Sequence, residues 1–588
     1  MRTLLTSLLL AALAAAQVSP NGPPLSPFRG MRAVENGIEV QVADDTWLAL
    51  EAVAGVDTAT LLREADRLCG HSAWKRITED LPALLDAMGH QVGDVVDLKV
   101  RDLATNELRD LPAVKMTSEN RRRVKDANGG RGAAEIAPGS AKPLSPADAR
   151  ADLQQLQRLL DDHFAYRELR KVDLAGLLRT ADGALGTQPI DAVAFTRHID
   201  RILRAFGDGH SRLDAVPPAS DVFMPCLVQG VVGGFVAFRA DRTELVDGER
   251  PFVRAIDGVP LEQWLAAAKA HVTQGSPAMQ AREAERLLRN LGDLRAELKV
   301  AATKTVTLTL HGKSGTRDLA LELTNRKPTF GAWPRTATRL LDGNIGYLRL
   351  PQMVDDEPFL AGLDDAMQSF RTTKGLVIDV RGNGGGTRGA LRRLAPYFLP
   401  ELGAPVVGNV AAVLLDRSRP AAADALADRG LFRLDWTQWT DSQRTAITAF
   451  ARTFKPSWKL PTGKFSPWHF LVMDRADNPQ AFAYTQKVIV LIDRGCFSAT
   501  DVFAAALGAL PNVTLVGEST SGGSGRAQRH VLAKSGVRLQ LSTMASFRPD
   551  GVLFEGNGVV PDVVIVMQPG DLIGASDSAL TKAIELLQ

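Results

Sequence analysis

Cysteine is scarce in this sequence. The 588 residues include only Cys69, Cys226 and Cys496, which lie far apart. An odd number of cysteines at this spacing excludes a disulfide framework, and no CxxC or HExxH pattern offers the ligand spacing of a zinc site. We therefore expect a fold that depends on buried apolar side chains and needs no metal.

The chain also lacks an excess of charge of one sign. Its 69 basic and 67 acidic residues give a net charge of +2, which excludes a strong attraction to nucleic acid or anionic lipid. Hydrophobic residues make up 45% and charged residues 23%, as in ordinary globular proteins. Because the length exceeds what one hydrophobic core organises, we expect three or four domains.

Long apolar runs are missing after the N-terminus, so no segment is predicted to span a membrane. The start, MRTLLTSLLLAALAAAQ, places Arg2 before an apolar run that ends in small residues near Ala16. This pattern is typical of a signal peptide. We interpret residues 1–16 as that peptide and the protein as exported, to the periplasm or out of the cell.

Composition and periodicity divide the remaining chain. Residues 28–117 alternate short apolar runs with an amphipathic helix and predict a small α+β domain. Residues 118–147, rich in charge, Gly and Pro, indicate a linker. Residues 148–213 repeat leucines on one helical face and predict a helical subdomain. Residues 221–327 predict a β-rich module with two helical stretches, and residues 335–588 alternate buried strands with helices, which predicts an α/β domain.

The stretch KVIVLIDRGCFSATDVFAAALGAL contains the first candidate for chemistry. An apolar strand leads into a tight turn at Gly495, and Ser498 lies where the next helix should begin. Backbone N–H groups at a helix N-terminus, such as that of Ala499, can stabilise an oxyanion. However, Ser498 and Asp501 also match a capping box, in which the serine only satisfies unpaired N–H groups. Taken alone, the cap is the more common role.

The stretch GLVIDVRGNGGGTRG is a second strand, turn and helix. Its glycines leave a backbone that a ligand can approach closely, as an N–H nest for an oxyanion requires. Gly384, Gly386 and Gly389 also satisfy GxGxxG, but the motif lies deep in the chain. The acidic residue downstream, Glu401, lies in a loop-like segment rather than at the end of a strand. A dinucleotide site is therefore disfavoured.

A serine nucleophile needs a base and a carboxylate that orients it. Among the nine histidines, His210 follows a helix in the turn FGDGHSRL, which can direct an imidazole into a neighbouring cleft, and His530 is the rival base. Glu555 lies in a Gly-flanked turn within DGVLFEGNGVVPD. Each residue alone is more often structural than catalytic.

Together these motifs resemble the serine peptidase family of C-terminal processing, or tail-specific, proteases and the tricorn core protease. DVRGNGGG, SATD after an apolar strand, LVGESTSGGSG and EGNGVVPDVVI occur in the family's order, and FGDGHSRL closes the helical region as in the family. The resemblance covers about residues 148–588. It implies a ClpP/crotonase-like α/β peptidase domain, and FVRAIDGVPLEQWL is similar to a PDZ-like module.

The resemblance also assigns roles. Ser498 matches the nucleophile, although Asp501 replaces a usual Glu, and the lysine base of tail-specific members falls on Gly523. Tricorn-like members use a histidine and a glutamate that correspond to His210 and Glu555.

A serine that precedes the histidine in tricorn-like members is Gly209 here, so the sequence departs from those members at this position. The resemblance thus implies a Ser498, His210 and Glu555 peptidase that needs no cofactor and acts on peptides or proteins.

We expect backbone oxyanion donors at Ala499 and at Gly385 or Gly386. The main alternative is a non-catalytic protein of the same fold that binds an apolar ligand or a peptide. An esterase is disfavoured because Ser498 lacks the GxSxG elbow.

Overall fold

The computed structural model describes residues 25–34, 37–44, 46–69, 73–90, 92–103, 105–129, 143–214, 216, 220–331, 333–415 and 425–588. The predicted signal peptide lies outside these residues. The chain divides into two compact units. The first consists of residues 1–135 and 354–369, and the second of residues 136–353 and 370–588.

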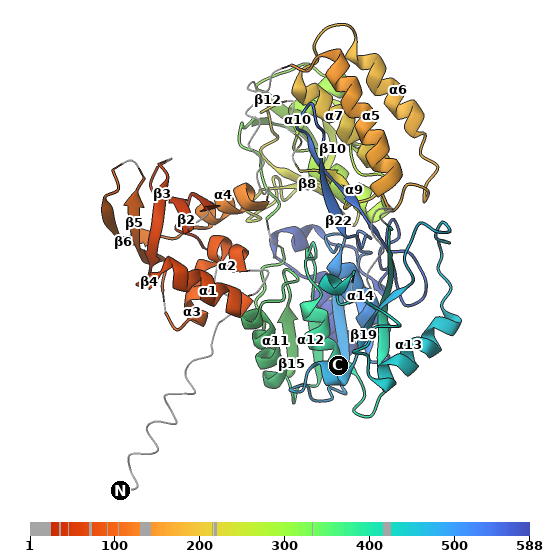
Figure 1. Ribbon diagram of the computed structural model, residues 1–588. Helices are drawn as coiled ribbons and strands as arrows, with labels where there is room; N and C mark the ends of the chain where they lie inside the picture. Colours follow the sequence, from red (N-terminus) through yellow and green to blue (C-terminus); the bar gives the residue numbers. More distant parts are fainter. Residues whose placement is uncertain are drawn as a thin grey trace. The chain divides into compact units, whose positions relative to one another are not determined.

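The first unit is an antiparallel sheet with helices, as expected for an α+β domain (Figure 1). Its strand order is β1-β2-β3-β5-β6, and β4 pairs with β3. Leu61 and Leu85 from the helices share one core with Val40 and Val100 from the strands. Its elements are β1 (Gly30–Val34), β2 (Gly37–Gln41), β3 (Leu48–Val53), β4 (Val56–Asp57), α1 (Thr58–Cys69), α2 (Ala73–Glu79), α3 (Leu81–Ala87), β5 (Val95–Asp102), β6 (Leu108–Lys115), α4 (Ser118–Gly129) and α11 (Glu357–Ser369).

The predicted linker at residues 118–147 is wrong at both of its ends. Its first part forms helix α4, and Val124 on that helix is buried in the core of the first unit. At the other end, Pro146 already opens helix α5 (Pro146–His163), with the Ser145 side chain accepting a hydrogen bond from the Asp148 N–H. The sequence of α4 is rich in charged residues, and Val124 is its one apolar buried residue among those described. A single apolar residue shows no helical periodicity, so the sequence did not predict this helix.

Three amphipathic helices open the second unit: α5, α6 (Leu174–Leu185) and α7 (Ala192–Ala205), the orange and yellow ribbons of Figure 1. Leu153, Leu156 and Leu160 on α5 are buried, as their spacing predicts. These helices share a core with Leu539 and Leu541 of strand β23 (Arg538–Ser542). The helical segment thus packs directly on the C-terminal part of the chain.

The β-rich module at residues 221–327 has the strand order β13-β12-β10-β9-β8, and β11 pairs with β10. It contains three helices rather than the two that the sequence predicts. Trp264 on α8 is fully buried and donates its indole N–H to the Ile256 carbonyl oxygen at 3.0 Å. The elements are β8 (Leu227–Val231), β9 (Gly234–Phe238), β10 (Phe252–Ile256), β11 (Val259–Pro260), α8 (Leu261–Ala270), α9 (Pro277–Leu287), α10 (Leu291–Leu298), β12 (Thr305–Gly312) and β13 (Gly315–Glu322).

A six-stranded sheet of order β14-β15-β16-β20-β21-β25 forms the centre of the C-terminal region. All pairs except β14 with β15 are parallel, and Val377 lies opposite Ile489 in the register. Continuous apolar runs such as VIVLI suit strands buried on both faces. The elements are β14 (Arg339–Leu341), β15 (Ile345–Arg349), β16 (Gly375–Asp379), α12 (Gly389–Phe398), β20 (Lys487–Ile492), α14 (Ala499–Gly508), β21 (Val513–Gly517), β25 (Val563–Val564) and α15 (Ser578–Leu587).

Two smaller sheets complete the second unit. One has the order β18-β19-β17-β24, and the other has the order β22-β23-β7. Strand β7 begins two residues after His210 and pairs with β23. This pairing places His210, which follows the helical segment in the sequence, beside the C-terminal region. The elements are β7 (Arg212–Leu213), β17 (Val406–Val413), η2 (Ala427–Arg429), β18 (Phe432–Arg433), α13 (Asp441–Thr453), β19 (His469–Met473), η3 (Arg475–Asp477), β22 (Ala527–Val531), β24 (Met544–Phe547) and η4 (Pro569–Ile573).

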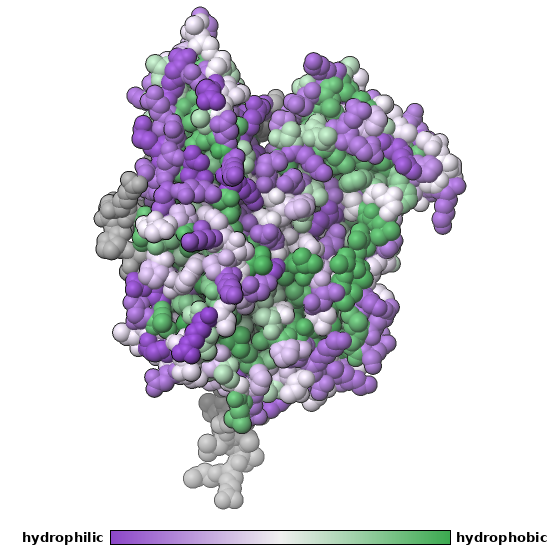
Figure 2. Space-filling view, turned by 90° about the vertical axis from the view of Figure 1, so that its right-hand side faces the viewer, coloured by the Kyte–Doolittle hydropathy of each residue, from purple (hydrophilic) through white to green (hydrophobic). Residues whose placement is uncertain are grey.

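The surface drawn in Figure 2 interleaves hydrophilic and hydrophobic residues. Within the described ranges, no helix combines the length and the apolar character needed to cross a membrane.

Candidate active site

Ser498 lies at the end of the turn that joins β20 to α14. Strand β20 is buried from Val488 to Ile492, and α14 is buried along almost all of its length, so both ends of the turn are held firmly. Ser498 itself has φ 62° and ψ −118°. A non-glycine residue in this left-handed region costs on the order of 1–3 kcal/mol, and such strain is concentrated at functional sites.

The expected capping role of Ser498 is wrong. A capping serine has extended backbone angles and accepts a hydrogen bond from an N–H of the first helical turn, whereas Ser498 makes no such bond. The second member of the predicted box, Asp501, instead accepts hydrogen bonds from the Thr520 hydroxyl and the Gly522 N–H. Burial raises the pKa of Asp501 to about 7.

His210 contacts Ser498 directly. Its Nε2 atom lies 2.9 Å from the Ser498 hydroxyl oxygen, and its ring stacks on Phe497 with centroids 4.6 Å apart. The Gly207 turn, with φ 67°, directs the chain out of α7, and β7 then fixes it against β23. The rival base, His530, instead lies beside His163 with ring centroids 5.3 Å apart.

Burial keeps the His210 imidazole neutral. Desolvation lowers its pKa to about 4, and the cations Arg429 and Arg212 act in the same direction, while Asp208 opposes them. A neutral imidazole can accept the proton of the serine hydroxyl. The ring therefore has the protonation state of a base at neutral pH.

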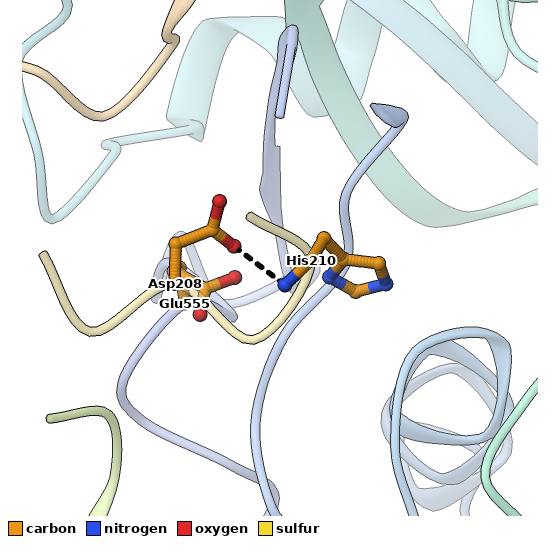
Figure 3. A group of neighbouring side chains, drawn as sticks. All are labelled: Asp208, His210 and Glu555. Atoms are coloured by element: carbon orange, nitrogen blue, oxygen red, sulfur yellow. Dashed lines mark hydrogen bonds between the residues drawn. The ribbon is translucent and has the colours of Figure 1, made fainter. Parts of the chain in front are cut away.

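Two carboxylates lie behind the imidazole, and Figure 3 draws them on the same side of His210. One ligand-type atom from each of Asp208, His210 and Glu555 lies within 4.8 Å of the others. Asp208 accepts the His210 backbone N–H at 3.0 Å, and Glu555 Oε1 accepts the Gly209 N–H at 3.2 Å. Glu555 Oε2 and His210 Nδ1 are both buried and have no hydrogen-bond partner. These two unsatisfied atoms are complementary.

The sequence did not single out Asp208. It lies two residues before His210, and its second oxygen accepts the Ser211 hydroxyl, which in turn accepts the Ser542 N–H at 2.9 Å. Burial and the charge of Asp208 raise the pKa of Glu555 well above its usual range. The FGDGHS turn carried one signal that could have identified Asp208, namely a carboxylate adjacent to the candidate base.

The three residues could also ligate one cation, but the imidazole among them is the ring that contacts Ser498. No further group of this kind occurs in the part of the chain that the structure describes.

The glycine-rich turn after β16 reaches the serine. A Cβ at Gly385, where φ is 99°, would lie 2.7 Å from Ser498 Cβ and 3.0 Å from the Ala499 nitrogen. The Gly385 N–H donates to Asn383 Oδ1 at 2.9 Å, so this N–H is occupied within the turn. The Gly386 N–H makes no hydrogen bond among the described residues, and the Ala499 N–H, at the first position of α14, has no partner within the helix.

The aromatic ring of Phe497 lies close to two glycines near the candidate site. A Cβ at Gly209 would lie 2.7 Å from both Phe497 Cζ and Met279 Cε, so a serine there would require these side chains to shift. A Cβ at Gly523 would lie 2.5 Å from Phe497 Cε2, so a lysine there would also require the ring to shift.

A cavity of about 630 Å³ opens at the carboxyl ends of the parallel strands, where Arg381, Asp493 and Glu518 line it. Neither Ser498 nor His210 borders this cavity, so its size does not identify the site of chemistry. The hydrogen bond between these two side chains is the stronger indicator.

Residues 344–565 match the model of Peptidase family S41. Mature CPAF complexed with lactacystin aligns with a TM-score of 0.53 at 17% identity, over 75% of this chain and 97% of that one. A CPAF mutant aligns with a TM-score of 0.55 at 18% identity, over 75% and 96%. The photosystem II D1 C-terminal processing protease gives a TM-score of 0.36 at 18% identity, over 73% and 98%. The two CPAF structures share the fold of this chain.

Proposed function

Because residues 344–565 form a serine-type peptidase domain of Peptidase family S41, we propose that the protein is an exported endopeptidase whose nucleophile is Ser498. The substrate is a peptide or protein. Ser498 attacks the carbonyl carbon of the scissile bond, its proton passes to His210, and His210 returns the proton to the leaving amine. Water then hydrolyses the acyl-enzyme by the same route.

The hydrogen bond between His210 Nε2 and the Ser498 hydroxyl carries this proposal. A serine is a weak nucleophile without a base, and these two side chains come from positions 288 residues apart in the chain. A purely structural serine has no need of a strained backbone that directs its hydroxyl towards a neutral imidazole.

Glu555 serves as the carboxylate that orients the His210 imidazole. For His210 to accept a proton at Nε2, its neutral ring must carry hydrogen on Nδ1, and Glu555 Oε2 is the unpartnered acceptor near it. Burial and the charge of the neighbouring Asp208 raise the pKa of Glu555, so the two carboxyl groups interact beside the imidazole. Asp208 also holds the turn in place through the His210 N–H.

The Ala499 and Gly386 N–H groups are the oxyanion donors that fit best. Gly385 contributes close backbone approach instead, because its own N–H is occupied. One donor of this kind contributes about 10²- to 10³-fold to the rate. Residues 221–327 are interpreted as a PDZ-like module that holds part of the substrate, on the basis of the sequence resemblance.

Peptide cleavage followed by mass spectrometry tests the function. The mature chain is incubated with a peptide library, and cleavage that is absent in Ser498→Ala supports the proposal. Ser314→Ala, an exposed serine of the β-rich module, is the matched control and should cleave like the native chain. Absence of cleavage by the native chain, together with tight binding of an apolar ligand, would instead identify a non-catalytic carrier.

A further inference from the structure

The β-rich module and the turn that carries Ser498 meet at a set of arginines. Arg242, Arg282 and Arg286 from the module line a pocket of about 80 Å³, and Gly382 and Gly495 of the peptidase turns line its other side. Gly495 precedes Ser498 by three residues. Any group held in this pocket contacts both parts of the molecule.

These arginines have no acidic partner. In the described part of the chain, neither Arg242, Arg282 nor Arg286 forms an ion pair, and the buried Nε of Arg282 makes no hydrogen bond. Burial and the neighbouring guanidinium groups lower the pKa of Arg242 and of Arg286 to about 10, so both remain charged at neutral pH. Buried charges without counter-charges are costly, and an anion would offset that cost.

The carboxylates that border the pocket are engaged elsewhere. Glu285 accepts Arg494 at 2.7 Å, and Glu518 forms an ion pair with the same guanidinium at 3.4 Å. Asp493 Oδ1 accepts the N–H groups of Gly382 and Gly495, each at 2.8 Å. Asp493 attracts Arg242 and Arg286 from a distance but lies beyond ion-pair range.

Arg242 is held rigidly enough to form part of a built site. Only 7% of its surface is exposed, and its guanidinium donates to the carbonyl oxygens of Leu572 at 2.9 Å and Phe330 at 3.3 Å. The guanidinium also lies over the rings of Trp333 and Phe238, 4.8 and 5.0 Å from their centroids. Arg286 lies 5.0 Å from the Phe330 ring centroid. A rigid guanidinium loses little entropy when it binds an oxyanion.

We propose that this pocket binds a small oxyanion, a carboxylate or a phosphate group, between the arginines of the module and the turn that carries Ser498. The volume accommodates a group of a few heavy atoms, and planar guanidinium groups match the oxygens of either anion. The bound anion links Arg282 and Arg286 on α9 to the peptidase turns and so couples the module to the nucleophile. This site lies outside the proposed catalytic group, and its test does not require activity.

Calorimetric titration of the full mature chain with inorganic phosphate tests the proposal, at constant ionic strength set with chloride. The native chain should bind saturably, and Arg282→Gln/Arg286→Gln should raise the dissociation constant at least tenfold. Arg239→Gln/Arg317→Gln removes the same charge from exposed positions of the same module, 63% and 56% accessible, and should change the constant less than twofold.

Absence of saturable binding, or equal constants for the native chain and the pocket variant, would overturn the site. Arg282→Lys/Arg286→Lys keeps both positive charges and is the control for a loss of folding in the glutamine variant. Circular dichroism checks that each variant is folded. The lysine variant should bind phosphate more weakly than the native chain and more tightly than the glutamine variant, because ammonium groups lack the planar fork.

Competition between phosphate and peptides identifies the source of the anion. The experiment uses the Ser498→Ala variant, in which the peptide should not be hydrolysed. A peptide with a free C-terminal carboxylate that displaces phosphate, while its amide does not, assigns the pocket to a peptide terminus. Retention of phosphate against both peptides assigns it to a free anion.

Discussion

Two turns of the peptidase domain are built alike and used differently. Strands β16 and β20 are buried, parallel and adjacent, and each leads through a short turn into a helix. The first turn presents backbone through Gly385 and Gly386, both at positive φ, whereas the second presents a side chain through Ser498, also at positive φ. Glycine adopts such angles without cost, but a nucleophile needs a Cβ. The strain therefore falls on the residue that we propose as the nucleophile.

Ser498→Ala should produce the largest change. Removal of the hydroxyl should lower kcat/KM by about 10⁴-fold or more, because the remaining groups only bind and polarise the substrate. The fold should be retained, since the one side-chain hydrogen bond of the hydroxyl within the described residues is that with His210. Cleavage of a fluorogenic peptide measures the loss, and activity within tenfold of the native chain would contradict the assignment.

Gly386→Ala should damage the other turn. A Cβ there would overlap the Met353 carbonyl oxygen, and φ is 142°. We expect a loss of about 2 kcal/mol in the free energy of unfolding and a fall in kcat of about 10²-fold as the candidate donor moves.

Gly384→Ala is the matched control, because no atom lies within 4 Å of its Cβ position. It should unfold and react like the native chain. Equal behaviour of the two variants, measured by urea unfolding and peptide cleavage, would show that Gly386 has no special role.

The buried imidazole beside the second turn should make stability depend on pH. The folded pKa of His210, about 4, lies below the unfolded value of about 6.5, so the unfolded state binds the proton more tightly. Above pH 6.5 the imidazole is neutral in both states and causes no loss. Stability then falls as the pH drops from 6.5 towards 4, by about 2 kcal/mol at pH 5.

His210→Gln should remove that part of the pH dependence. His311→Gln, a partly exposed histidine of β12, should leave it unchanged. Urea unfolding at several pH values measures both slopes, and identical slopes for all three proteins would contradict a buried neutral imidazole.

The smallest effect concerns the strain itself. Ser498→Gly should be more stable than Ser498→Ala by about 1 kcal/mol, because glycine relieves the positive φ. At Ala449, exposed in helix α13, the change from alanine to glycine should instead cost about 1 kcal/mol. The same sign at both positions, in thermal unfolding, would mean that Ser498 is unstrained.

The sequence predicted the peptidase family, which the match over residues 344–565 confirms, and the α/β character of the C-terminal domain. It also predicted that His210 would reach Ser498. The distance of 2.9 Å between His210 Nε2 and the Ser498 hydroxyl oxygen agrees with that prediction. The order of the motifs along the chain was the basis for the family and for the pairing of His210 with Ser498. Several motifs far apart in a sequence match one family in order when the fold brings them to one site.

The remaining details depended on competition between hydrogen-bond partners, which the sequence does not encode locally. Asn383 occupies the Gly385 N–H, and Thr520 and Gly522 occupy the carboxylate expected to complete a cap with Ser498. The partners of that carboxylate come from a turn about twenty residues further along the chain. Which donor bonds to which acceptor therefore depends on the three-dimensional structure, which brings these distant residues together.

A serine-reactive phosphonate tests the central claim most directly, with the modified residue identified by mass spectrometry. The account predicts labelling at Ser498 that falls at least 100-fold in rate in His210→Ala and persists in His311→Ala. Labelling of Ser498 at the same rate in the native chain and in His210→Ala would show that this imidazole does not activate the serine.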